Sequence, residues 1–100
     1  MHAVVNHLHF KDPVDPGLFS AVEGELGARM RRLSGFRGAR VLYVSDRHVI
    51  LVIFGDTAQT LDRMATELGN TWMRENVVPL LERPPERHMG EVIAAADAAE

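Results

Sequence analysis

Four of the five histidines stand where their imidazoles could do chemistry. His7 and His9 are two residues apart, so an extended strand would place both on one face. His48 and His88 open two later predicted strands, whose starts should lie near the end of the first. His9, His48 and His88 could therefore gather at one sheet edge as a zinc or iron site.

No carboxylate stands at an obvious ligand spacing beside these histidines, so we predict no bound metal. An imidazole with an ordinary pKa of about 6.5 is well suited to proton abstraction near neutrality. His7 is therefore the candidate general base. The alternative is that His7 packs against a second copy of the chain.

Asn6 lies on the opposite face of the same predicted strand, residues 3–10, with Val4, Leu8 and Phe10. A buried amide left unpaired costs about 1–3 kcal/mol, so Asn6 needs a partner. That partner is either a ligand oxygen, such as an enolate in a pocket, or the protein backbone or water. Polar groups in apolar pockets tend to set ligand orientation, so Asn6 is a candidate site residue.

Two aromatic residues are candidate ligand contacts. Trp72 ends an apolar helical stripe, where it either packs in the core or forms a stacking wall for an aromatic ligand. Tyr43 lies in a predicted hairpin, where its hydroxyl could donate to a phenolate or its ring could pack at a dimer interface. The residues leave both pairs of alternatives open.

Other site types have no support in the residues. There is no cysteine, so neither a disulfide framework nor a thiolate metal site is available. The sequence has no GxGxxG, P-loop, nucleophile elbow or HExxH motif. Hydrolase and nucleotide-dependent functions are therefore disfavoured.

The elements that must position these residues begin with the strand at 3–10, followed by a helix. Asp15 is the predicted N-cap, with Pro16 at the first helical position. An apolar stripe at near-helical spacing continues from there to Leu33, and Gly35 is the predicted stop. Gly24 and Gly27 within the helix cost about 1 kcal/mol each, which indicates close backbone packing.

A hairpin follows, with strands at 41–44 and 48–54. Its second strand reads VILVIF and is apolar on both faces, whereas a strand with one wet face should alternate. The two helices cover only one face of the sheet. We therefore expect a second subunit to cover the other, making a homodimer.

A second helix should open at Asp56 or Thr57 and be interrupted at Gly69-Asn70, and a last strand should run from His88 to Ala95. The order is β-α-β-β-α-β, an α+β fold of the split βαβ, ferredoxin-like type. Right-handed crossovers then place the first strand between the third and fourth of an antiparallel sheet. We expect one domain over residues 1–96 and a frayed tail at 97–100.

Composition favours an ordinary globular domain: 46% of the residues are hydrophobic, 25% are charged and the net charge is −3. The arginines are mostly scattered, so we expect no nucleic-acid partner. No apolar run approaches the roughly 20 residues of a membrane span. No secretory signal is visible, which predicts a cytoplasmic protein without a membrane partner.

The sequence resembles the dimeric α+β barrel superfamily, in its antibiotic-biosynthesis-monooxygenase-like branch. The resemblance rests on VVNHLHF, GFRGARVLY, VILVIFGD, NTWMRENVVPLL and HMGEVIA, and spans nearly the whole chain. It implies two sheets paired face to face, with a pocket in each subunit between its sheet and its helices. Members include cofactor-independent quinone-forming monooxygenases, haem-degrading monooxygenases and isomerases.

The resemblance implies a small cofactor-independent monooxygenase acting on a planar aromatic or polyketide-like substrate. Asn6 would orient the substrate, His7 would assist proton removal, and Trp72 and Tyr43 would contact the ligand. One alternative is a non-catalytic dimer that binds a small ligand. The other is haem binding and degradation, for which Asn6 matches the family asparagine, although no histidine occurs between His48 and His88.

Overall fold

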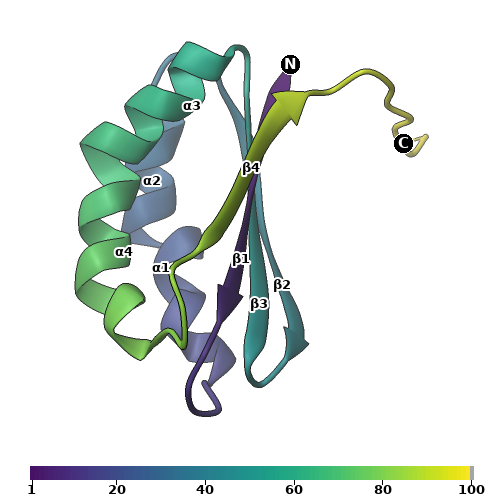
Figure 1. The fold of residues 1–100 in the computed structure, drawn as a ribbon. Helices are drawn as coiled ribbons and strands as arrows, with labels where there is room; N and C mark the ends of the chain where they lie inside the picture. The colour runs from purple at the N-terminus through teal and green to yellow at the C-terminus, as the bar shows by residue number, and fades with distance from the viewer. Residues whose placement is uncertain (100) are drawn as a thin grey trace.

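The computed structural model describes residues 1–99 and shows a four-stranded sheet with all helices on one side (Figure 1). The strands are β1 (His2–His9), β2 (Phe36–Ser45), β3 (His48–Gly55) and β4 (Glu86–Glu91). They pair antiparallel in the order β2-β3-β1-β4. The predicted α+β class and the central position of β1 are both confirmed.

The first helical segment differs from the single helix that was predicted. It consists of η1 (Pro16–Phe19), α1 (Ser20–Glu23) and α2 (Glu25–Arg31), with a break at Gly24. The Asp15 cap is confirmed, because its carboxylate accepts from the Gly17 amide at 2.7 Å. The helix ends at Arg31, before the predicted stop, and Gly35 adopts a φ of +90° in the turn into β2.

Gly27 has the close packing predicted for it. A Cβ at this position would lie 2.1 Å from the carbonyl oxygen of Val22, so only glycine fits there. Gly24, by contrast, would place a Cβ no closer than 3.6 Å to any neighbour. The prediction of close packing was therefore right at Gly27 and wrong at Gly24, where the glycine marks the break instead.

The second helical segment is continuous. It consists of α3 (Ala58–Met64), a π-helical turn η2 (Ala65–Gly69), α4 (Asn70–Asn76) and η3 (Val78–Leu80). Thr57 is the N-cap, since its hydroxyl accepts from the Thr60 amide at 3.1 Å. The predicted interruption at Gly69-Asn70 is thus a widened turn rather than a break.

Register divides the strands into two faces. Leu8 and Val4 lie on the face toward the helices, where Leu8 pairs with Val49 and both are fully buried. This inner face carries two core clusters, one around Leu8, Phe10 and Phe19 and the other around Val4, Leu61 and Met64. On β1, even-numbered residues such as Asn6 therefore face the helices, and odd-numbered residues such as His7 face the other side.

The outer face carries Val5, Ile50 and Val52, all only half-buried. Leu42, the partner of Ile50 on β2, is 46% exposed. Within residues 1–99 no helix covers this face (Figure 1). β3, whose sequence is apolar on both faces, therefore has one face uncovered in the single chain.

The bounds of two strands were predicted wrongly. β2 begins at Phe36 instead of Val41, because its early residues pair with the end of β3. β4 begins at Glu86 and ends at Glu91, whereas a strand from His88 to Ala95 was expected. The expected tail at 97–100 includes Glu100, which lies outside the described residues.

No helix within residues 1–99 is long and apolar enough to cross a membrane.

Candidate functional site

A cavity of about 590 Å³ lies between the inner face of the sheet and the helices. Most of its lining is apolar, from strands β1 and β3 and from α2, α3 and α4. Asn6 and Trp72 both line it. The structure thus brings together two of the residues that the sequence singled out.

Asn6 is the polar residue of β1 that faces this cavity. It pairs with Leu51 of β3 on one side and Arg87 of β4 on the other, and it is half-buried. Among residues 1–99, the side-chain amide of Asn6 makes no hydrogen bond to another protein group. The amide is therefore free to bind an oxygen of a molecule in the cavity.

Trp72 forms part of the opposite wall, on α4. Its ring centroid lies 6.0 Å from that of Phe19, with the planes tilted by 57°. The indole is half-buried and packs against the first core cluster. A fixed aromatic surface facing an amide across an apolar space suits a flat ligand.

Arg87 is a site residue that the sequence did not reveal. It is the cross-strand partner of Asn6 on the same face, and it lines the cavity together with Arg74 of α4. Its Nη2 lies 3.5 Å from Oδ1 of Asp62, and its side chain is 41% exposed. The last strand was expected to begin at His88, which left Arg87 outside the sheet. In the structure this strand begins at Glu86, and Arg87 lies opposite Asn6.

The charge around the cavity is cationic. Arg74 and Arg87 are its charged lining residues, and in the described part of the chain no carboxylate or imidazole lines it. A guanidinium beside a neutral amide favours an anionic oxygen, because both groups donate hydrogen bonds to it. The cavity is therefore built to hold a molecule with an apolar body and an ionised oxygen.

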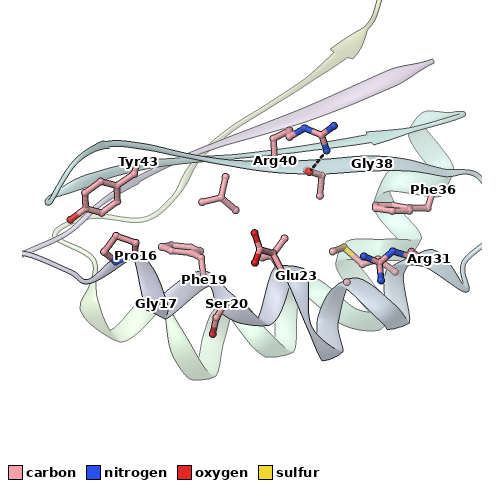
Figure 2. A pocket seen from close by; sticks show the side chains of 15 residues that line it. Pro16, Gly17, Phe19, Ser20, Glu23, Arg31, Phe36, Gly38, Arg40 and Tyr43 are labelled. Carbon is pink, nitrogen blue, oxygen red and sulfur yellow. Dashed lines mark hydrogen bonds between the residues drawn. The ribbon is translucent and has the colours of Figure 1, made fainter. Parts of the chain in front are cut away.

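Tyr43 lies in a different depression, a groove of about 760 Å³ between β2 and the first helical segment. Figure 2 shows Tyr43 above Pro16, and the Glu23 carboxylate directed toward the sheet. The Tyr43 hydroxyl donates to the Val14 carbonyl at 2.7 Å. Its hydroxyl is thus engaged by the protein, and it does not share the Asn6 cavity.

His7 lies on the outer face and is not brought to Asn6. Its neighbours are His9 on the same strand and His48 on β3, the cross-strand partner of His9. Nδ1 of His7 and Nε2 of His48 share a hydrogen bond of 3.1 Å. The two predicted catalytic residues therefore point to opposite sides of the sheet.

The expected gathering of His9, His48 and His88 is only partly correct. His9 and His48 do meet, but His7 is the third member of this histidine cluster. His88 pairs with Val5 further along β1, and its Nε2 lies 3.1 Å from Glu86 Oε1. His88 thus lies four positions along β1 from His9, the residue it was expected to meet.

Two pKa values near the histidine cluster depart from their ordinary values. Burial lowers the pKa of His48, and the positive forms of His9 and His7 lower it further. The hydrogen bond with His88 lowers the pKa of Glu86. The cluster therefore favours a neutral His48 beside an ionised Glu86.

No protein-family profile matches this chain, and no curated sequence matches it. Solved structures do resemble it. The cofactor-independent oxygenase SnoaB of Streptomyces nogalater is 16% identical with a TM-score of 0.70, over 94% of each chain. The monooxygenase from the gene ActVA-Orf6 of Streptomyces coelicolor, solved with nanaomycin D, is 18% identical with a TM-score of 0.70, over 98% of this chain and 92% of the other.

Rv0793 from Mycobacterium tuberculosis is 21% identical with a TM-score of 0.67, over 96% of this chain and 98% of its own. At these identities the likeness is one of fold. The chain has the fold of antibiotic-biosynthesis-monooxygenase-like proteins, two of which also match it over 94% and 93% of its length, and the resemblance seen in the sequence is confirmed at that level.

Proposed function

We propose that this protein is a monooxygenase-like enzyme that oxygenates a planar, enolisable aromatic substrate in the cavity between sheet and helices, without a cofactor. The observation that carries the proposal is that the unpaired Asn6 amide and Trp72 line one largely apolar cavity, with Arg87 beside Asn6. The oxygenases of the same fold support it, and one of them was solved with nanaomycin D bound.

The chemistry follows from what the cavity offers. A substrate methylene next to a phenol ring loses a proton and becomes a carbanion whose charge rests on the ring oxygen. Asn6 and Arg87 would donate to that oxygen and lower the substrate's pKa. Since no carboxylate or imidazole lines the cavity within residues 1–99, the proton passes to water at the cavity mouth.

The electrons for oxygenation come from the substrate itself. The carbanion gives its electron pair to dioxygen, and a carbon–oxygen bond forms, leaving a peroxide anion. Uptake of one proton and loss of water then turn the methylene into a carbonyl, so that one O2 is consumed and one water is released. No external reductant enters, which is consistent with the cofactor-independent assignment.

Haem does not fit this cavity well. The haem-degrading proteins that the sequence resembles use a histidine in the second helical region, and no histidine lines the cavity in the described residues. The alternative function favoured by a specific observation is non-catalytic binding of a planar anion. Within residues 1–99 the cavity lacks a side chain that could accept a proton, so the enzyme proposal needs water for that role. A protein that only binds the anion needs no proton acceptor.

We also propose that a second copy of the chain covers the outer face of the sheet. Ile50, Val52 and Leu42 form an apolar surface there that nothing in residues 1–99 covers. Burying such a surface stabilises by about 25 cal/mol per Å² of apolar area. The solution species would then be the homodimer that the sequence predicts.

Oxygen uptake tests the enzymatic proposal. With anthrone as probe, the protein should accelerate oxygen consumption over buffer, and Asn6→Ala should lower kcat by about 100-fold, the typical loss for one oxyanion donor. Gln59→Ala, which removes an exposed amide on α3, is the matched control and should retain full activity. A rate equal to that of buffer would contradict catalysis.

Titration of the protein with anthrone separates catalysis from binding. Trp72 is the single tryptophan, so quenching of its fluorescence reports occupancy of the cavity. Quenching by anthrone without oxygen uptake would favour the binding protein. Quenching that survives in Asn6→Ala and in Arg87→Gln, with no loss of affinity, would contradict the assignment of both residues.

A further inference from the structure

The histidine cluster on the outer face (His7, His9 and His48) is separate from the cavity and has no part in the proposed oxygenation. The residues come from two adjacent strands, and one ring nitrogen of each lies within 4.8 Å of those of the other two. Each imidazole is half-buried. Three nitrogen donors thus lie close together at one end of the sheet, on rings that are stacked and must rotate to point at one ion.

The spacing of these nitrogens is close to what a metal ion requires. Zinc binds imidazole nitrogen at about 2.0–2.1 Å in tetrahedral geometry, which places two ligand nitrogens about 3.3 Å apart. His7 Nδ1 and His48 Nε2 are already 3.1 Å apart. One ring nitrogen of each histidine lies within 4.8 Å of those of the other two, so side-chain rotations that bring the nitrogens closer by up to about 1.5 Å would complete the set.

The backbone holds the ligands in place. His7 and His9 are fixed on one face by the alternation of β1, and His48 lies directly across from His9 in the ladder. Ligands on paired strands need little ordering when an ion binds. Such a rigid set favours affinity, because the entropic cost of assembling it was met on folding.

Ring stacking alone does not explain the histidine cluster. The centroids of His9 and His48 are 4.5 Å apart and those of His7 and His48 are 5.3 Å apart, so the rings do stack. Yet among residues 1–99 no carboxylate or carbonyl is bonded to these rings, and the one bond they make joins His7 to His48. Ring nitrogens without other partners are available as ligands.

The electrostatic surroundings also suit a cation. Glu86 is the cross-strand partner of His7 on β4 and carries a negative charge on the same face. A carboxylate next to the ligands strengthens the binding of a divalent ion.

We propose that His7, His9 and His48 form a binding site for a divalent transition-metal ion, zinc in the first instance. Three neutral imidazoles leave a fourth tetrahedral position, which water or an external donor fills. The bound ion joins β1 to β3 at the end of the sheet next to the β2–β3 turn. The site is independent of the cavity and of the chemistry proposed there.

Calorimetric titration of tag-free, chelator-treated protein with ZnCl2 tests this site. We expect one zinc ion per chain and a rise in the thermal midpoint on saturation, because a ligand that binds only the folded state stabilises it. His9→Gln and His48→Gln should each weaken binding by at least about 10-fold. His88→Gln, which removes an exposed histidine on the same face, is the matched control and should bind as tightly as the wild type.

Several outcomes would overturn the site. These are the absence of saturable binding, a ratio of one zinc per two chains, or equal losses of affinity in His88→Gln and His9→Gln. If a variant fails to fold, histidine NMR spectra of the wild type decide the matter. Zinc should then shift the ring resonances of three histidines and leave those of His2 and His88 in place, and any other set of shifted histidines contradicts the assignment.

Discussion

The two faces of the sheet use the same strands but place their polar residues in different surroundings. On the inner face of β1, Asn6 lies between Leu51 and Arg87 in a largely apolar cavity, and its amide has no hydrogen-bond partner in residues 1–99. On the outer face, His7 and His9 meet a third histidine and bond within their own group. An isolated polar group in a cavity points to an organic ligand, whereas grouped donors point to an ion.

The apolar residues of the two faces differ as well. Leu8 and Val49 are fully buried under the helices, while Ile50 and Val52 on the outer side remain half-exposed. The inner face is complete within one chain. The outer face is complete only if something else covers it, and this contrast can be tested by substitutions on each side.

The largest effect should come from a charge on the outer face. Leu42→Asp places a carboxylate from each copy in the proposed dimer interface, opposite the apolar Ile50, and removing such a charge from water costs several kcal/mol. Light scattering should report twice the chain mass of 11.1 kDa for the wild type and a single chain mass for the variant. Gln59→Asp on the helical side should stay dimeric, and a monomeric wild type at micromolar concentration contradicts the interface.

The next effect concerns the inner core. Leu8→Ala removes a side chain with no exposure and should lower the free energy of unfolding by about 2–5 kcal/mol. Leu42→Ala, the same change at a 46% exposed site on the outer face, should lower it by less than about 1 kcal/mol in dilute solution. Denaturant unfolding of both variants gives the comparison, and equal losses would mean that the two faces do not differ in packing.

The smallest effect is a dependence of stability on pH. The folded pKa of His48 lies below its unfolded value, because of burial and of His9, His7 and Arg83, with Glu86 opposing. The unfolded chain therefore binds more protons, and stability that is complete above about pH 6.5 is lost as the pH falls toward the folded value. His48→Gln should flatten the unfolding profile between about pH 8 and pH 5, and an unchanged profile contradicts the assignment.

The faces of β1 could be predicted from the sequence because strand alternation requires only that the strand exist. Asn6 was placed correctly toward the helices, and Trp72 lies in the same cavity. The register of β4 against β1 could not be predicted, since the residues before His88 read as a loop and gave no strand start at Glu86. For that reason His7, and not His88, completes the histidine cluster.

Arg87 was missed for a related reason. Glu82 to Glu86 reads as a loop because two prolines stand within it, and nothing in those residues alternates. The hydrogen bonds of β1 nevertheless draw Glu86 and Arg87 into the sheet. A strand defined by its neighbour rather than by its own pattern is not visible in a single sequence.

The π-helical turn at Ala65–Gly69 determines which way the end of the second helical segment faces. An α-helix advances by about 100° for each residue, so one additional residue within a turn rotates everything after it by about that angle. Ala65 and Gly69 line the cavity together with Trp72, whereas Leu68 does not. The additional residue of the π-helical turn thus sets how α4 is rotated about its axis, and with it the position of Trp72 in the cavity that Asn6 lines. An unbroken α-helix would not contain this additional residue.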